Sequence, residues 1–151
     1  MRYWLMKSEP DDVSIDDLAA MPGQEVDWYG VRNYQARNYM RDEMQLGDRV
    51  FFYHSSCAEP GIAGIAEVSQ LAHPDATQFD PHSPYFDPKS NPEQPRWLCV
   101  TVRFIRKTNL YPLVEMRSNP QLEGMIVLQK GSRLSITPVS DMHAHWLEAN
   151  L

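Results

Sequence analysis

Residues 47–71, "GDRVFFYHSSCAEPGIAGIAEVSQL", contain two apolar segments joined by a polar turn. A Gly-Asp turn leads into the first segment, Arg49–His54, and the second, residues 61–71, is rich in Ile, Ala and Val. Both segments have the length and composition of β-strands. Gly61 and Gly64 indicate a bulge in the second strand or the close approach of another backbone. We therefore expect these two strands to belong to a central sheet.

The rest of the chain adds strands and short helices on either side of this pair. Further strands are expected over residues 3–7, 97–106 and 132–139. Helices are expected after the N-caps Ser14, Asn33 and Ser140, the first of them with Asp17 in a capping box. Residues 110–129 are expected to form short helical turns interrupted by prolines. Strands separated by short helices, without regular strand–helix alternation, favour an α+β fold. Both an open sheet and a small, partly closed barrel fit this pattern.

Composition is typical of a soluble globular protein. The 151 residues, 42% hydrophobic and 23% charged, favour a single domain over residues 1–151. No apolar run approaches the roughly 18 residues that a membrane span needs, so no membrane association is expected. Cys57 and Cys99 lack metal-ligand spacing and are expected to be reduced thiols of a cytoplasmic protein. We expect a monomer.

Charge is distributed unevenly along the chain. The net charge of −6 argues against a protein that coats duplex DNA by neutralising phosphates. Against this acidic background, residues 28–40, "WYGVRNYQARNYM", hold four aromatic residues, Arg32 and Arg37, and no acid. A second basic segment covers residues 96–107. These segments are either solvated surface or a local anion site.

A proline-rich segment, residues 73–97, contains six of the twelve prolines. It is too long for a hairpin turn and too aromatic for a flexible linker. Long ordered loops of this kind are often functional, but a stiff loop that packs its aromatics on the sheet and covers an open edge is equally consistent. Both interpretations remain open.

Several blocks of the chain, in order, resemble the EVE domain family: "YWLMKSEPDDVSIDDL", "WYGVRNYQARNYMR", "GDRVFFYHSS", "GIAGIAEV", "FDPHSPYFDPKS" and "RLSITPV". This resemblance implies a PUA-like fold, a curved and mostly antiparallel β-barrel with flanking short helices. It also implies kinship with YTH domains, which read methyladenine in RNA. EVE domains are proposed readers of modified bases, notably modified cytosines in DNA.

The resemblance to YTH domains can be carried over only where residues match. Lys7, Ser8 and Trp28 correspond to a Lys-Ser pair and a tryptophan wall of the YTH base pocket. The segment "FFYHSS", which contains Tyr53, resembles the strand that follows. The other two cage tryptophans of YTH domains have no counterpart, so a slot with one or two rings is expected.

The residue types near Trp28 suit a flat ligand. Trp28 with Tyr29 or Tyr34 can stack on a base, and Gly30 allows the backbone to come close to it. Contacts to the polar edge of the base are expected from Ser8, Asn33, His54 and Ser55. Phosphate contacts are expected from Arg32 and Arg37. We therefore predict a non-catalytic module, without cofactor or metal, that reads a modified base, a modified cytosine or a methyladenine, flipped out of DNA or RNA.

An enzyme is the alternative. His54 with a carboxylate, Glu67 or Asp80, could act as an acid–base pair on a small planar substrate or nucleotide. The sequence lacks a zinc-deaminase signature and a glycine-rich phosphate loop. A histidine within hydrogen-bonding reach of a carboxylate in one pocket would favour the enzyme, and a slot lined by rings without such a pair would favour the reader.

Overall fold

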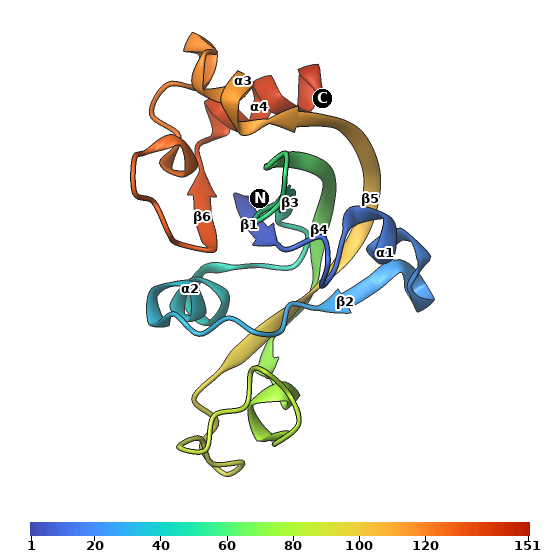
Figure 1. The fold of residues 1–151 in the computed structure, drawn as a ribbon, viewed down its shortest axis with the longest axis vertical. Helices are drawn as coiled ribbons and strands as arrows, with labels where there is room; N and C mark the ends of the chain where they lie inside the picture. The colour runs from blue at the N-terminus through green and yellow to red at the C-terminus, as the bar shows by residue number, and fades with distance from the viewer.

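Two long strands, β4 (Gly61–Pro74) and β5 (Leu98–Pro112), form a curved antiparallel hairpin that runs along the molecule (Figure 1). The computed structural model describes residues 1–151. β3 (Arg49–His54) pairs antiparallel with β4, and β1 (Tyr3–Ser8) pairs parallel with β3. Because β1 and β3 are parallel neighbours, their C-terminal ends lie side by side at the same end of the sheet.

Two short strands form the edges of the sheet. β2 (Glu25–Asp27) lies beside β5, and β6 (Ile136–Val139) lies beside β1, which gives the order β2-β5-β4-β3-β1-β6. β2 and β6 do not pair with each other, so the sheet is not closed into a barrel. The α+β prediction is confirmed, whereas the expected barrel is replaced by an open, curved sheet.

Four short helices cover the sheet: α1 (Ile15–Ala20), α2 (Tyr34–Asn38), α3 (Leu113–Arg117) and α4 (Asp141–Asn150). Ser14, Asn33 and Ser140 cap α1, α2 and α4 as predicted, each accepting a bond from a backbone N–H of the first turn. A single π-helical turn (Tyr39–Glu43) continues α2, and 3₁₀ turns lie at Pro22–Gln24, Ala76–Phe79, Pro120–Leu122 and Ile126–Leu128. None of the helices combines the length and apolar character needed to cross a bilayer.

The sheet buries side chains on both faces. In β3, Val50 and Phe52 join the core that includes residues of α1 and α2, while Phe51 and Tyr53 join a second core with residues of α3 and α4. Successive side chains of a strand point to opposite faces, so a strand covered on both sides must be apolar at every position. This explains the continuous apolar run in the middle of β3.

Three strands differ in extent from the predictions, and one strand was not predicted. β2 was not predicted, β4 runs to Pro74, β5 continues to Pro112, and β6 is shorter than expected. β4 and β5 are longer than predicted because each provides hydrogen-bond partners for the backbone of the other. The pairing continues despite several irregularities in register. A Cβ at Gly61 would run into the Tyr111 carbonyl, so the expected close approach of a second backbone is confirmed.

The proline-rich segment forms a compact lobe beyond the end of the β4–β5 hairpin (Figure 1, yellow-green, at the bottom). Gln78 lies buried at its centre and donates to the carbonyls of Asp75 and Trp97, both at 2.7 Å. The same amide accepts the Trp97 N–H at 3.0 Å. The lobe thus contains little regular secondary structure, and buried polar side chains such as Gln78 contribute to its order.

Candidate functional site

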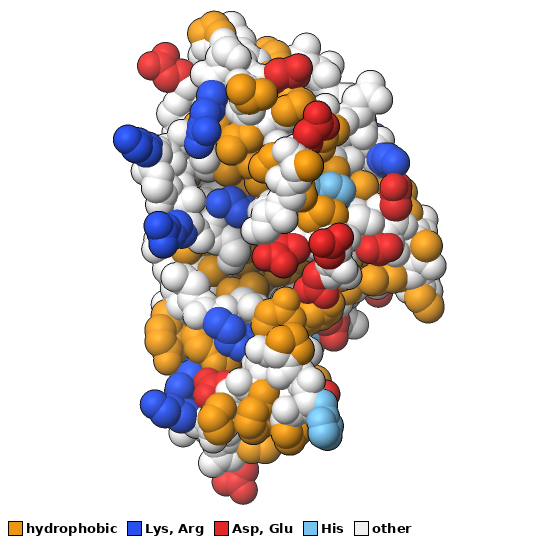
Figure 2. Space-filling model, in the orientation of Figure 1, with side chains coloured by type: hydrophobic (Ala, Val, Ile, Leu, Met, Phe, Trp, Pro, Cys, Tyr) orange, Lys and Arg blue, Asp and Glu red, His pale blue; other side chains and the backbone are white.

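A cleft of about 450 Å³ opens where β1 and β3 end, beside the chain that leaves β2. Its volume lies within the roughly 300–1,000 Å³ of small-molecule sites. Figure 2 shows basic side chains along the left of the molecule and acidic side chains in the middle and to the right of the same face. The cleft is lined by residues of β1 and β2, of the segments that follow β1, β2 and β3, of the proline-rich lobe and of the segment before β6: Lys7, Ser8, Glu9, Asp12, Val13, Val26, Asp27, Trp28, Tyr29, Gly30, Val31, Arg32, Ser55, Ser56, Tyr85, Arg133 and Ser135.

Trp28 forms part of the cleft wall and is 7% exposed. The edge of its ring system meets Phe52 with the ring centroids 5.3 Å apart, which fixes its position against the core. The indole N–H groups of Trp4 and Trp97 donate to Asp48 and Asp87. That of Trp28 has no protein acceptor and is not sealed from solvent. Trp28 thus has one hydrogen-bond donor left for a ligand.

Two tyrosines and an aspartate link the lobe to the cleft rim. The hydroxyls of Tyr29 and Tyr85 donate to the two carboxylate oxygens of Asp12, at 2.7 and 3.0 Å. Burial, together with the hydrogen bond to Asp12, raises the pKa of Tyr85 to about 12, and the same causes raise the pKa of Tyr29 further. Both phenols therefore stay protonated at neutral pH and act as fixed donors.

An ion pair anchors the chain after β2. Asp75 is fully buried and accepts the Gly30 N–H at 2.8 Å and Arg32 Nη1 at 3.0 Å. Burial acts to raise the pKa of Asp75, but hydrogen bonds from Thr77, Gly30 and Arg32 outweigh it and lower the pKa. Arg32 also donates to Thr77 and to the carbonyls of Val31 and Tyr85, so all five of its N–H groups have protein partners. Arg32 lines the cleft as predicted, but its donors hold the lobe in place and are not free for a phosphate.

Two other cations at the cleft lack a carboxylate partner. Lys7 is half-buried, and burial lowers its pKa. Its ammonium lies 6.0 Å from the centroid of the Tyr53 ring. Arg133 is exposed in the loop before β6 and forms no ion pair. Lys7 and Arg133 are therefore the cations next to the cleft that no carboxylate pairs with, and the Lys7 ammonium lies on the Tyr53 side of β1.

Three predicted site residues, Asn33, Tyr34 and Arg37, lie outside the cleft. Asn33 accepts the Ala36 N–H at 3.0 Å as the cap of α2. Tyr34 stacks on Trp97 with the ring centroids 4.9 Å apart. Arg37 lies over the Tyr34 ring and donates to the Arg96 carbonyl and to Asn38. The predicted convergence of Arg32 and Arg37 is not observed, because Arg37 is bound to Asn38 and to the Arg96 carbonyl, which precedes β5.

Tyr53 and His54 also differ from the prediction. Tyr53 points to the face of the sheet opposite Phe52 and Trp28, as the alternation of β3 requires. His54 Nε2 accepts the Ile15 N–H at 3.1 Å, and burial lowers the pKa of this histidine. Neither residue lines the cleft.

The acid–base pair of the enzyme alternative is not formed. Glu67 pairs with Arg49 and Arg103, at other points of the sheet. Asp80 accepts the His82 N–H at 2.9 Å inside the lobe. His54 has no carboxylate within hydrogen-bonding distance.

Lys7, Ser8, Trp28, Tyr29, Gly30 and Ser55 do line the cleft, and their contacts to a ligand stay a prediction. Sequence reasoning missed lining residues close to the predicted ones and lining residues from distant parts of the chain. The first group is Glu9, Asp12, Val13, Val26, Asp27, Val31 and Ser56, and the second is Tyr85, Arg133 and Ser135. Tyr85 and Arg133 stand inside blocks already noted as characteristic, "FDPHSPYFDPKS" and "RLSITPV". Membership in those blocks was the one sequence signal that marked Tyr85 and Arg133 as candidates. Only the folded structure shows that they lie near Trp28.

A model of the EVE domain matches residues 2–150. The chain belongs to the EVE domain family. A solved structure of a Pseudomonas syringae protein is 47% identical to this EVE domain, covers 97% of both chains and superposes with a TM-score of 0.92. A crystal structure described as human THYN1 in complex with 5-methylcytosine-containing DNA is 42% identical, covers 99% of this chain and 96% of its own, and has a TM-score of 0.90.

Human thymocyte nuclear protein 1 is 45% identical over 91% of this EVE domain. The aligned region is 68% of the human protein and 64% of the chicken protein of the same name, so the chain spans about two thirds of these relatives. They are named as nuclear proteins, which contradicts the cytoplasmic location expected from the reduced cysteines. That expectation rested only on the redox state of thiols, which does not separate nucleus from cytoplasm.

Proposed function

We propose that this EVE domain is a non-catalytic nucleic-acid-binding module that accepts a modified cytosine, flipped out of DNA, in the cleft beside Trp28. The observation that carries the proposal is Trp28 itself, a ring at the cleft wall whose indole N–H has no protein partner. The human relative solved with 5-methylcytosine-containing DNA supports the choice of ligand.

The groups around the cleft match the chemistry of a cytosine. Its exocyclic amine is a donor that carboxylates accept, and Glu9 lines the cleft with no side-chain partner in the protein. Its carbonyl and ring nitrogen are acceptors for the Trp28 indole and for the hydroxyls of Ser55, Ser56 and Ser135, whereas the Ser8 hydroxyl already donates to the Val13 carbonyl at 2.6 Å. Val13, Val26 and Val31 supply apolar surface for a methyl group. This set of groups takes over the edge contacts first assigned to Asn33 and His54.

Lys7 and Arg133 take over the phosphate contacts from Arg32 and Arg37. Both line the cleft without a carboxylate partner, so neither has to break an ion pair to reach a phosphate. The acidic remainder of the chain disfavours non-specific binding along a duplex. In this proposal the binding free energy therefore comes mainly from contacts to one flipped nucleotide and its flanking phosphates.

The test is fluorescence anisotropy with two oligonucleotides that differ only in one 5-methyl group. Stacking is worth about 1–3 kcal/mol per base, so Trp28→Ala is expected to weaken binding to both roughly 10- to 100-fold. Trp146→Ala, which removes a half-buried ring packed on Tyr111 at the other end of the sheet, is the matched control. A folded Trp28→Ala protein that binds as tightly as the parent would refute the proposal.

Discrimination between the two oligonucleotides must come from the edge contacts and the apolar wall. Glu9→Gln keeps the size of the side chain and replaces the carboxylate by an amide. It is expected to weaken binding of both cytosine-containing oligonucleotides, whereas Val26→Ala is expected to narrow the gap between them. A methyl group in an apolar pocket is worth only about 1–3 kcal/mol, which limits the gap to roughly 10- to 200-fold.

A further inference from the structure

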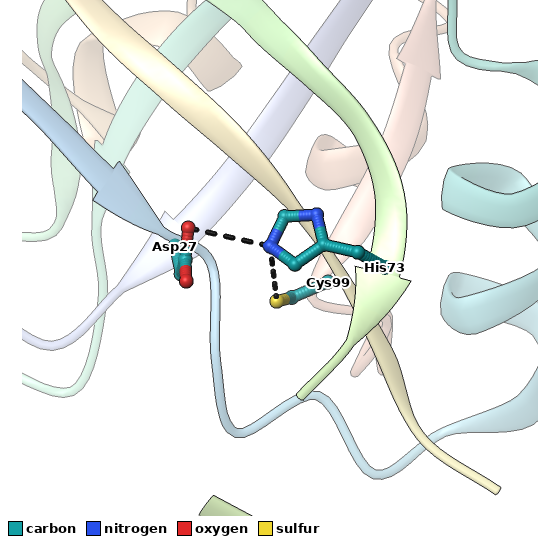
Figure 3. Close-up of side chains that lie close together, drawn as sticks. All are labelled: Asp27, His73 and Cys99. Carbon is teal, nitrogen blue, oxygen red and sulfur yellow. Dashed lines mark hydrogen bonds and ion pairs between the residues drawn. The ribbon is translucent and has the colours of Figure 1, made fainter. Parts of the chain in front are cut away.

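Three potential metal ligands meet beside the cleft, on three neighbouring strands. Asp27 ends β2, His73 lies near the end of β4 and Cys99 near the start of β5 (Figure 3). His73 Nε2 lies 3.4 Å from Asp27 Oδ1 and 3.5 Å from Cys99 Sγ. All three ligand atoms lie within 4.8 Å of one another. The cluster is outside the set of residues assigned to the base.

The arrangement differs from that of a nucleophilic triad. In a Cys–His–acid triad, the thiol and the acid occupy opposite nitrogens of the imidazole. Here both approach Nε2, while Nδ1 lies 2.9 Å from the Leu71 carbonyl. A carbonyl can only accept, so Nδ1 carries the proton and Nε2 presents its lone pair to the other two groups. Metal-bound histidines have the same arrangement, with the second nitrogen donating to a carbonyl or carboxylate.

The distances fit one ion held by all three groups. Zinc lies about 2.0–2.1 Å from nitrogen, about 2.3 Å from sulfur and about 2.0–2.2 Å from a carboxylate oxygen. At tetrahedral angles these bonds separate the ligand atoms by roughly 3.3–3.6 Å. The observed 3.4 and 3.5 Å from Nε2 fall in that interval. Only the Asp27 carboxylate, which is 58% exposed, needs to adjust to complete the site.

The surroundings support a bound cation. Thr101, a buried residue of β5, donates its hydroxyl to Asp27 Oδ1 at 2.7 Å and so orients the carboxylate. A shallow depression lined by Asp27, Gln70 and Thr101 leaves one side open to solvent. Three protein ligands with an open fourth position are typical of zinc sites that bind a water or another exogenous ligand.

We propose that Asp27, His73 and Cys99 form a binding site for a divalent transition-metal ion of the zinc class. The thiolate and imidazole ligands exclude Mg²⁺ and Ca²⁺, which prefer oxygen. On binding, the Cys99 thiol releases its proton to solvent and its sulfur forms the bond to the metal. The ion ties β2, and with it the neighbouring Trp28, to the β4–β5 hairpin. The site rests on this geometry alone and is independent of the proposed function.

The experiment titrates reduced, chelator-treated protein with Zn²⁺ against a chromophoric competitor, and with Co²⁺ followed by absorption. We expect one equivalent to bind, a thiolate-to-cobalt charge-transfer band, and a higher melting temperature with metal. Cys99→Ser should abolish the band, and Cys57→Ser, which removes the other free thiol, should leave it unchanged. Circular dichroism confirms that each variant is folded.

His73→Gln provides a second variant in case Cys99→Ser fails to fold, because His73 is only half-buried. It is expected to weaken Zn²⁺ binding by more than the roughly 10- to 100-fold that loss of a supporting group costs. Absence of the charge-transfer band in the parent, a band that depends on Cys57, or unchanged Zn²⁺ affinity in His73→Gln would each overturn the proposal.

Discussion

At the scale of single residues, Gly30 has a conformation that other residues disfavour and no room for a side chain. Its φ is +85°, and a Cβ would lie 2.8 Å from the Tyr85 ring. We predict that Gly30→Ala lowers the free energy of unfolding by about 2–4 kcal/mol, the sum of backbone strain and overpacking. Gly131→Ala is the control, because its φ of +78° carries the strain but nothing lies within 4 Å. Equal losses in urea denaturation would contradict the Tyr85 contact.

Arg32 is a structural residue in our account, in contrast to Arg133. We predict that Arg32→Gln lowers the free energy of unfolding by about 3 kcal/mol, because the buried Asp75 loses its ion pair. Arg133→Gln is expected to change stability by no more than about 0.5 kcal/mol, as for other exposed, unpaired side chains. Chemical denaturation of the two variants distinguishes these roles. Similar stability for both would be inconsistent with a stabilising Arg32–Asp75 ion pair.

His54 makes stability depend on pH. Burial lowers its pKa below the ordinary 6.5, so the folded protein favours the neutral ring that accepts the Ile15 N–H. The stabilisation is complete above the unfolded pKa and is lost as the pH falls through the folded pKa. We predict that His54→Gln, which keeps an acceptor but does not titrate, loses less stability than the parent between about pH 8 and about pH 5. Parallel pH profiles in thermal denaturation would rule this out.

At the scale of elements, the lobe depends on Gln78. Gln78→Leu keeps the volume but leaves the buried Trp97 N–H without an acceptor and removes the amide that bridges the carbonyls of Asp75 and Trp97, which keep only a backbone N–H each. A buried orphan costs about 1–3 kcal/mol. We predict faster hydrogen exchange over residues 75–97 with little change in β3, measured by mass spectrometry. The exposed Gln129→Leu is the control, and uniform loss of protection would show that the lobe is not a separate unit.

The same scale shows what sequence reasoning could reach. β3 and the caps of α1, α2 and α4 were predicted correctly because local chemistry determines them. β2 was missed because three residues become a strand only through pairing with β5, far along the chain. The cleft was predicted in part, since Trp28 and its neighbours are adjacent in sequence. Two residues come close to this segment only in the folded chain. Asp75 forms an ion pair with Arg32, and Arg133 lines the cleft without an ion-pair partner.

At the scale of the whole molecule, positive charge at the cleft is scarce on a chain with a net charge of −6. If Lys7 and Arg133 supply the phosphate contacts, the slope of log affinity against log salt should be shallow, about −2. We predict that Lys7→Gln and Arg133→Gln each reduce the magnitude of this slope by about one. Neither should change the preference for the methylated oligonucleotide. The exposed Lys130, which does not line the cleft, is the control position. Slopes that do not respond to either change would place the phosphates elsewhere.

The position of β1 in the sheet has a consequence for synthesis on the ribosome. Tyr3 pairs with Arg49 on one side and with Val139 on the other, so β1 must wait for a strand that is synthesised much later in the chain. Until then the apolar β1 has a bare edge, which is the kind of surface that pairs with other chains. Non-local pairing of this kind also slows folding. Nascent chains that stall before β6 emerges are therefore expected to depend on chaperones, whereas released full-length chains are not.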